Sequence, residues 1–397
     1  MNVAVDFKNV DIVFGDRSPE AIRLLDKGAT RSEILEKTGA VLGCAGASLT
    51  INEGEISVLM GLSGSGKSTL LRAVNRLNIV SRGTIMVRDR DKMVDVVSCD
   101  ETTLRRVRQQ TVAMVFQQFG LLPWRTVEEN VGLGLELAGM PEAERKPRVD
   151  RQLKLVNLEQ WSKKYGHELS GGMQQRVGLA RAFATEAPIL LMDEPFSALD
   201  PLIRTKLQDE LLALQKTLRK TIIFVSHDLE EALKIGNHIS IMEGGRIVQT
   251  GRPEDIVLRP ANDYVREFIA NVNPLSVLTA YNVMRDARDL EAAGEGWVWL
   301  DRRKTTRFQI GPDRKIVAAE RDNRNADWVA CSEAEKPLPP KSRVVFWATP
   351  GTPLRTVMLA MHRADTAPVA LFDEQQRFVG AIGVRDVLQA ILRRAIN

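Results

Sequence analysis

The segment EISVLMGLSGSGKSTLLRAVNRL, residues 55–77, decides the fold. An apolar strand, a glycine-rich turn and an amphipathic helix follow one another, which is the context of a phosphate-binding loop. Gly61, Gly64 and Gly66 let the backbone bend so tightly that successive N–H groups can face a phosphate. The helix that begins near Lys67 adds the positive end of its dipole. A glycine turn that only joins strand to helix is the alternative, and the complete GxxxxGKS pattern disfavours it.

The loop predicts a site for a nucleoside triphosphate with Mg²⁺. Lys67 supplies a mobile cation for the β- and γ-phosphates, and the Ser68 hydroxyl suits Mg²⁺. The residues predicted to contact ATP in this loop are Gly61, Leu62, Ser63, Gly64, Ser65, Gly66, Lys67, Ser68 and Thr69.

A second strand ends in the acidic groups that hydrolysis needs. PILLMDEP, residues 188–195, is a continuous apolar run, as in a strand buried on both faces of a parallel sheet. At the carboxyl end of such a strand, Asp193 can hold the hydration shell of Mg²⁺ while Glu194 polarises the attacking water. For this motif alone, a strand that ends at solvent is the alternative.

A third strand is predicted by TIIFVSHDLEEAL, residues 221–233, with His227 just beyond its end. In the company of the two preceding motifs, His227 is predicted to contact the γ-phosphate. A helix-entry or core histidine is the alternative for a lone residue of this kind. Strands that alternate with helices in this way predict an α/β fold.

A second glycine motif opens the segment LSGGMQQRVGLARAF, residues 169–183. It has no lysine at the phosphate-binding position, so it is not a second phosphate-binding loop. Ser170, Gly171 and Gly172 nevertheless form a helix start with free N–H groups and a small hydroxyl, which suits an oxyanion. A serine N-cap with a flexible entry is the alternative.

Taken together, these motifs resemble the ATP-binding cassette of ABC transporters over roughly residues 5–250. The family order is Walker A (61–69), the Q-loop glutamine in MVFQQF, the signature (169–174), Walker B, the D-loop SALD (197–200) and the switch histidine. The resemblance implies a RecA-like core with a helical signature subdomain and an antiparallel β subdomain. It also implies a head-to-tail homodimer, in which each ATP lies between one copy's P-loop and the other copy's signature.

The resemblance further assigns roles to individual residues. Phe14 stacks on adenine, Gln117 senses Mg²⁺ and the membrane partner, and Glu194 is the general base. The implied catalytic residues are Glu194, His227 and Lys67. Those implied for the metal are Ser68, Gln117 and Asp193. The D-loop residue is Asp200, and those acting in trans are Ser170, Gly171, Gly172 and Gln174.

Two departures from a minimal cassette narrow the resemblance. Residues 18–48 are predicted to form a helical insertion, and FGLLPWRTVEENVGLGLEL follows Gln117. Both segments are similar to the corresponding parts of importer ATPases for glycine betaine, proline betaine and choline. The amino-acid sequence around Trp124 is most similar to that of choline-type members. The family partners are a membrane permease and a separate substrate-binding protein, and residues 118–135 are the predicted docking surface for the permease.

The composition shifts near residues 273–274, which predicts an ATPase domain over 1–275 and a regulatory region over 276–397. Residues 352–392 resemble a CBS module, a small α+β fold, so a CBS-like module is expected over about 341–395. A divergent first CBS-like part is expected over about 278–340. Family members usually have Ser or Thr three residues before Asp386, where this chain has Gly383, and the missing hydroxyl argues against phosphate binding there.

Charge and cysteine content argue against several classes of protein. The net charge is +4, all of it in residues 278–397, and such a mildly basic tail argues against nucleic-acid binding. Three scattered cysteines without a CxxC pair fit a reducing cytosol. The N-terminus has no signal-peptide pattern, and no apolar run approaches the ~20 residues that cross a bilayer. Together with these observations, the resemblance to ABC transporter ATPases implies a peripheral protein at the cytoplasmic face of the plasma membrane.

Trp297 and Trp299 share one face of a predicted strand. Aromatic rings bind quaternary ammonium ions well, so the pair could form a choline or betaine cage in the tail. Packing of these rings in a small core or a dimer contact is the alternative.

Three rival functions stay open at this point. They are an importer ATPase for another small solute, a soluble ABC protein of translation or DNA repair, and a CBS-type nucleotide sensor with a vestigial cassette. A translation or repair protein would carry two cassettes or a long coiled coil, and the sequence has neither. Intact Lys67, Asp193, Glu194 and His227 argue against a vestigial cassette.

Overall fold

The computed structural model describes residues 2–336 and 344–396. The chain divides into two compact units, Met1–Ile256 with Ala261–Phe268, and Val257–Pro260 with Ile269–Asn397. The division passes through helix α10 (Pro253–Leu258). Each unit is described by itself.

The first unit is built on a sheet with strand order β10-β9-β3-β8-β7-β6. All neighbouring pairs are parallel except β9 and β10. The strands are β3 (Ile56–Met60), β6 (Val112–Val115), β7 (Ile189–Asp193), β8 (Thr221–Val225), β9 (His238–Glu243) and β10 (Arg246–Gly251). Every residue of β3, β7 and β8 is buried, as their continuous apolar sequences predict. Their carboxyl ends therefore lie together at one edge of the sheet.

A second, antiparallel sheet has strand order β2-β1-β4-β5. Its strands are β1 (Val3–Phe14), β2 (Val41–Asn52), β4 (Arg82–Asp89) and β5 (Lys92–Asp95). Its inner side chains share one hydrophobic core with the parallel sheet and with α3 (Lys67–Ala73).

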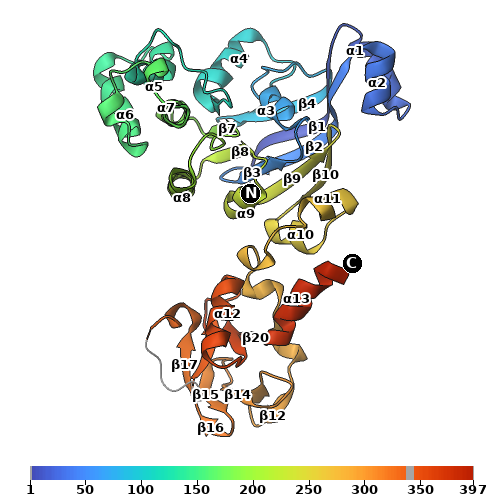
Figure 1. The fold of residues 1–397 in the computed structure, drawn as a ribbon, viewed down its shortest axis with the longest axis vertical. Helices are drawn as coiled ribbons and strands as arrows, with labels where there is room; N and C mark the ends of the chain where they lie inside the picture. The colour runs from blue at the N-terminus through green and yellow to red at the C-terminus, as the bar shows by residue number, and fades with distance from the viewer. Residues whose placement is uncertain (1, 337–343, 397) are drawn as a thin grey trace. The chain divides into compact units, whose positions relative to one another are not determined.

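Helices α1 (Ser18–Asp26) and α2 (Arg31–Thr38) lie between β1 and β2 in the chain, and they project from the ends of these strands (Figure 1). The predicted insertion covers 18–48, whereas the helices end at Thr38. Residues from Val41 onward form β2 because Val41 pairs with Phe14 and continues the antiparallel ladder. The two helices pack on a small core of their own, made of Val13, Ala21, Leu25, Ile34, Ala40, Leu42 and Ala45.

A helical group lies to one side of the sheets (Figure 1, green). It contains α5 (Val127–Leu137), α6 (Glu142–Leu155) and α7 (Gly171–Ala184), which pack on a common core. The remaining helices of this unit are α4 (Glu101–Arg106), α8 (Pro201–Leu218), α9 (Leu229–Ile235) and α11 (Asp263–Phe268). Within the described ranges, none of the helices is both long and apolar enough to cross a membrane.

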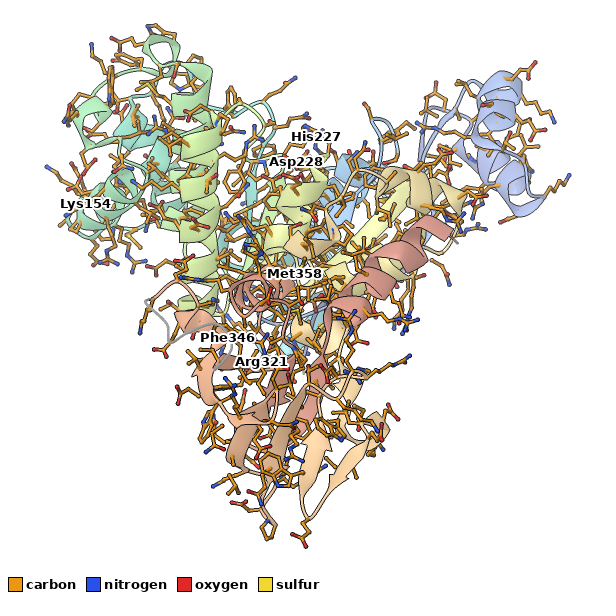
Figure 2. The ribbon with its side chains drawn as sticks, turned by 60° about the horizontal axis from the view of Figure 1, so that its bottom comes forward. Lys154, His227, Asp228, Arg321, Phe346 and Met358 are labelled. Atoms are coloured by element: carbon orange, nitrogen blue, oxygen red, sulfur yellow. The ribbon has the colours of Figure 1, made fainter. Side chains whose placement is uncertain are left out.

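The second unit contains a sheet with order β11-β20-β19-β18-β17. Its strands are β11 (Arg285–Asp286), β17 (Asp327–Ala330), β18 (Val344–Ala348), β19 (Val369–Phe372) and β20 (Phe378–Ile382). Helices α12 (Leu354–Arg363) and α13 (Val384–Ile396) follow β18 and β20 in the chain. Phe346 of β18 belongs to the core that joins the sheet to the helices, and the partly buried Met358 of α12 packs against that core (Figure 2).

An antiparallel meander packs against this sheet through a second core. Its strands are β12 (Ala292–Gly294), β13 (Trp297–Trp299), β14 (Thr306–Ile310), β15 (Ile316–Arg321) and β16 (Arg324–Asn325). The meander occupies most of the range expected for a first CBS-like part, and the described residues of that range, 278–336, form strands and 3-10 turns without an α-helix. The expected boundary between the two CBS-like parts falls in residues 337–343, outside the described residues.

Replacing Phe308 by alanine should destabilise the C-terminal unit by about 3–5 kcal/mol, because it removes a fully buried ring from the core beneath the meander. Its ring stacks on that of Phe372, with the centroids 6.2 Å apart. Urea denaturation followed by tryptophan fluorescence would measure the change, since four of the six tryptophans lie in this unit. Val317→Ala, on the neighbouring strand and 57% exposed, is the control and should change the free energy of unfolding by less than about 0.5 kcal/mol. Equal effects of the two substitutions would contradict the assigned core.

Candidate functional site

The glycine loop between β3 and α3 is enclosed by other backbone segments. Gly61 has a φ of +140°, and a Cβ there would lie 2.2 Å from the Met242 carbonyl oxygen. Gly66 has a φ of +100°, and a Cβ there would lie 2.3 Å from the Gly43 carbonyl oxygen. Neither position accepts a side chain. The loop is thus held from both sides by β2 and by the end of β9.

Lys67 folds back over the loop that precedes it. Its Nζ donates to the carbonyl oxygens of Gly61, at 2.9 Å, and Leu62, at 3.0 Å. Burial lowers the pKa of the Lys67 ammonium, and the carboxylates of Glu194 and Asp193 oppose that shift. The cation is therefore held inside the loop by weak acceptors, which phosphate oxygens can replace.

Asp193, the last residue of β7, is completely buried and fully paired. Its Oδ1 accepts a hydrogen bond from Ser68 Oγ at 2.6 Å. Its Oδ2 accepts from Arg72, at 2.7 Å from Nη2 and 3.1 Å from Nε. The two residues predicted from separate motifs to serve the metal are thus in direct contact.

The pair of Ser68 and Asp193 fits Mg²⁺, because hydroxyl and carboxylate oxygens are the ligands this ion prefers. Across the described part of the chain, no group of three His, Cys, Asp or Glu side chains could hold a metal by itself. A Mg²⁺ ion here would therefore take its remaining ligands from the nucleotide and from water, as is usual for this ion. Gln117, the third predicted metal residue, contacts Glu194 instead.

Glu194 is the point where three motifs meet. Its Oε2 accepts a hydrogen bond from Gln117 Nε2 at 3.0 Å and lies 3.3 Å from His227 Nδ1. Its φ is +48°, which is uncommon for a residue with a side chain, and its N–H donates to the Val225 carbonyl at 3.1 Å. The strained backbone and this bond turn the carboxylate from the end of β7 toward the end of β8.

The signature residues form the first turn of α7. Ser170 caps the helix, its Oγ accepting from Met173 N at 3.4 Å, which is the cap that the alternative interpretation of this segment expects. Gln174 points backward and donates to the carbonyls of Gly166 and Leu169. Among described residues, no hydrogen bond joins Ser170, Gly171, Gly172 or Gln174 to residues 61–69. Within one copy of the chain, the described contacts therefore do not join the two glycine motifs by hydrogen bonds.

Two other predicted residues lie in exposed positions beside the site. Phe14, at the end of β1, is 41% exposed. A Cβ at Gly43 would lie 2.7 Å from the Phe14 ring and 2.9 Å from the Thr69 methyl group, so this ring lies beside the start of α3. Asp200 caps α8 by accepting from Ile203 N at 3.0 Å.

The sequence interpretation missed Gln175, which is 1% exposed. Its Nε2 donates to the Glu194 carbonyl, and its Oε1 accepts from Ala198 N, both at 3.2 Å. It therefore connects the signature helix to Walker B and to the D-loop. The signal was present, because Gln175 shares a helix face with Leu179 and Ala182, and a polar residue on a buried face needs partners.

A buried polar network lies behind His227 and was also missed. Ser226 Oγ donates to Glu231 Oε2 at 2.6 Å and accepts from Asp228 N at 2.9 Å. Gln208, from α8, donates to Glu231 Oε1 at 3.0 Å. Figure 2 shows His227 and Asp228 next to each other. Because Asp200 of the D-loop caps α8, the network connects the switch histidine loop to the helix that follows the D-loop.

In the second unit, Trp297 and Trp299 do share one strand face. The Arg307 guanidinium lies over both rings, 4.7 Å from one centroid and 5.4 Å from the other, and it pairs with Glu320. The cation in contact with these rings is therefore the chain's own, which disfavours the cage interpretation. Asp386, at the divergent CBS motif, accepts from Arg285 Nε at 3.0 Å and from Gly383 N at 2.7 Å.

The Glu231 carboxyl should make stability depend on pH. Burial raises its pKa, so the folded state favours the neutral form. Its contribution is fully present below the ordinary glutamate pKa and is lost as the pH rises through the raised value. The free energy of unfolding of the native chain, relative to Glu231→Gln, should therefore fall as the pH rises from below the ordinary glutamate pKa through the raised value. Urea titrations of both proteins over this range measure it, with Glu230→Gln, on the exposed side of the same helix, as control. A difference that stays constant with pH would refute this assignment.

Comparisons with known proteins identify the family of the chain. Residues 44–197 match the model of the ABC transporter family, and residues 341–393 match the CBS domain. The chain is 41% identical, over all of both chains, to the glycine betaine/proline betaine transport system ATP-binding protein ProV of Salmonella typhimurium. It is 46% identical, over 56% of each chain, to the choline transport ATP-binding protein OpuBA of Bacillus subtilis. The narrower prediction of a choline-type member is not supported, since the choline protein matches over little more than half of the chain.

The chain is also similar to a solved structure of a dimeric cassette. The cassette MJ0796, described as the dimeric structure of a post-hydrolysis state bound to ADP and Pi, is 30% identical over 63% of this chain and 98% of its own, with a TM-score of 0.54. The predicted fold class is confirmed: an α/β ABC ATPase domain with a C-terminal CBS domain. The chain belongs to the family of ABC transporter ATP-binding proteins that contains ProV, and it is an ABC transporter ATPase.

Proposed function

We propose that this chain drives an importer for quaternary amines of the glycine betaine and proline betaine type. The observation that carries the proposal is the Glu194 carboxylate, held between Gln117 and His227 where β7 and β8 end. The end-to-end similarity to ProV supports the substrate class.

Hydrolysis follows from the arrangement of these groups. Glu194 takes a proton from water as the water oxygen attacks the γ-phosphorus and the bond to the ADP oxygen breaks. Lys67 offsets the negative charge that develops on the phosphate oxygens, and His227 positions the γ-phosphate. Mg²⁺, held through Ser68 and the surroundings of Asp193, would supply further positive charge to the β- and γ-phosphates when bound. Gln117 keeps the Glu194 carboxylate oriented until substrate arrives.

Each ATP is proposed to be enclosed by two copies of the chain. Within one copy the signature turn at Ser170–Gly172 is separate from the P-loop, so its N–H groups and hydroxyl are available to a nucleotide held by the partner. The dimeric state printed for MJ0796 supports this arrangement. In it, ATP closes the dimer and loss of the γ-phosphate opens it.

The membrane permease is proposed to dock beside the Q-loop. Trp124, in the segment predicted as the docking surface, is 71% exposed. A cleft of about 280 Å³ lies beside Phe116, just before this segment, and is also lined by Leu77, Gln109, Arg181 and Thr185, among others. Arg181 of α7 donates to the carbonyls of Phe119, at 2.9 Å, and Gly120, at 2.7 Å. A displacement of this segment would therefore be passed directly to the signature helix. Such docking places the protein at the cytoplasmic face of the membrane, next to a permease fed by a separate binding protein.

Residues 276–397 are proposed to regulate the ATPase domain that residues 1–275 form. The single CBS-family match supports a sensory module. At its divergent motif, the Asp386 carboxylate is already engaged by Arg285 and by the Gly383 N–H. A ligand there would have to displace an internal ion pair.

Glu194→Gln should retain ATP binding and lower the turnover number by about 10²–10⁴-fold, because the amide cannot accept a proton from water. The closed dimer should then persist with ATP inside, which light scattering with and without Mg·ATP would detect. Glu159→Gln, an exposed glutamate on the helical side of the unit, is the control. Hydrolysis by Glu194→Gln at the native rate would exclude this residue as the base.

Substrate class is tested by reconstituting the chain with its permease and binding protein in liposomes. ATP-dependent uptake of labelled glycine betaine or proline betaine is the expected result, with choline and an amino acid as comparison solutes. Uptake of choline alone would restore the narrower prediction. Uptake of neither betaine nor choline, by a complex that transports another solute, would overturn the proposed substrate class.

A further inference from the structure

The helical insertion borders the nucleotide site. It leaves β1 just after Phe14 and returns through Val41, which pairs with Phe14, so both its ends lie beside the proposed adenine-stacking ring. Gly43 of β2 lies between the Phe14 ring and the start of α3, since a Cβ there would be 2.7 Å from that ring and 2.9 Å from the Thr69 methyl group. Nothing in the proposed function assigns a task to these two helices.

One side chain of the insertion reaches the phosphate-binding loop. Arg31, the first residue of α2, donates from Nη1 to the carbonyl oxygen of Gly64 at 2.6 Å. The start of α2 is fixed by a capping box, in which Thr30 N donates to Glu33 at 2.7 Å and Glu33 N donates to Thr30 Oγ1 at 3.3 Å. Ile34, one turn after Arg31, is completely buried in the core of the insertion. The backbone that carries Arg31 is therefore anchored on both sides.

This contact controls the orientation of one peptide plane at the tip of the loop. The C=O and N–H of a trans peptide point in opposite directions. In the Gly64–Ser65 peptide, the oxygen is held by Arg31, and the N–H donates to the Leu62 carbonyl at 3.1 Å. Gly64 itself has a φ of +79°, with no atom within 4 Å of the place where a Cβ would be, so side-chain packing does not hold this tip.

We propose that Arg31 is a positioning residue for the nucleotide, supplied by the insertion. It fixes the Gly64–Ser65 peptide so that the neighbouring loop N–H groups face the β- and γ-phosphates. It also places a permanent positive charge beside a loop that receives a highly charged ligand. The insertion thereby raises affinity for ATP and ADP alike without touching the reacting atoms. This inference rests on the proposed ATPase function.

The test uses the full chain with Glu194→Gln as background, so that ATP is bound and not consumed. Equilibrium binding of radiolabelled ATP with Mg²⁺ is measured for Arg31→Gln, Arg31→Lys and Lys37→Gln. Lys37→Gln is the matched control, because it removes the same charge from the exposed last turn of the same helix. Arg31→Gln should weaken ATP binding about three- to tenfold, the range for one exposed charge-assisted hydrogen bond. Arg31→Lys should restore part of the affinity, and Lys37→Gln should change little.

A merely structural role is excluded by kinetics in chains that retain Glu194. Arg31→Gln should raise the KM for ATP by the same factor and leave kcat within about twofold, since only binding is altered. Its ATP affinity should also depend less on salt than that of the native chain. If Arg31→Gln folds poorly by circular dichroism, Arg31→Lys carries the comparison, and it should bind ATP more weakly than both the native chain and Lys37→Gln.

The outcomes separate this inference from the proposed function. If Glu194→Gln alone binds no ATP, the proposed function fails. If it binds ATP and adding Arg31→Gln leaves the affinity unchanged, only the role of Arg31 is overturned. Equal losses for Arg31→Gln and Lys37→Gln would likewise overturn it, because a general charge effect would then explain the change.

Discussion

The nucleotide site depends on the parallel register of β3, β8 and β7. Val225 of β8 pairs with Leu59 on one side and with Asp193 on the other. The residues that follow each strand therefore emerge at one edge of the sheet, where the P-loop, Walker B and the switch histidine meet. A slip of this register would move the Asp193 carboxylate into an apolar interior, away from Ser68 and Arg72, and an unpaired charge there is strongly unfavourable.

Buried polar side chains connect the groups that act on ATP. Gln175 connects the signature helix to Glu194 and to the D-loop, and the Glu231 network connects the switch loop to α8. Arg181 connects the Q-loop segment to the same signature helix. Gln175 and the side chains of the Glu231 network are hydrogen-bonded in the low-dielectric interior, where such networks fix a single geometry. The nucleotide site and the segment proposed to dock a permease are thus joined by a few specific contacts.

Burial and charge also explain the structure of the two parts added to the cassette, the C-terminal unit and the helical insertion. The CBS sheet buries one face under its helices and the other under the antiparallel meander, which explains why the meander needs no helices of its own. On the meander, Arg307 covers the tryptophan pair, so a feature that suggested ligand binding is satisfied internally. The helical insertion near the N-terminus has a small hydrophobic core of its own, and its Arg31 side chain contacts the P-loop.

The sequence by itself determined the α/β core, the P-loop, the acidic end of β7, the position of His227 and the helix start at Ser170. These features are local: glycine spacing, continuous apolar runs and capping residues act within a few neighbouring positions. It did not determine that Gln117 and His227 both contact the Glu194 carboxylate, or that Gln175 donates to the Glu194 carbonyl. Nor did it determine that Arg31 donates to the Gly64 carbonyl, or that Arg307 lies over the two tryptophan rings. It also left the meander ambiguous, because short strands between charged turns carry little periodicity. Only the tertiary structure decided these points, since each is a contact between segments whose approach is set by packing of the intervening chain and not by the residues themselves.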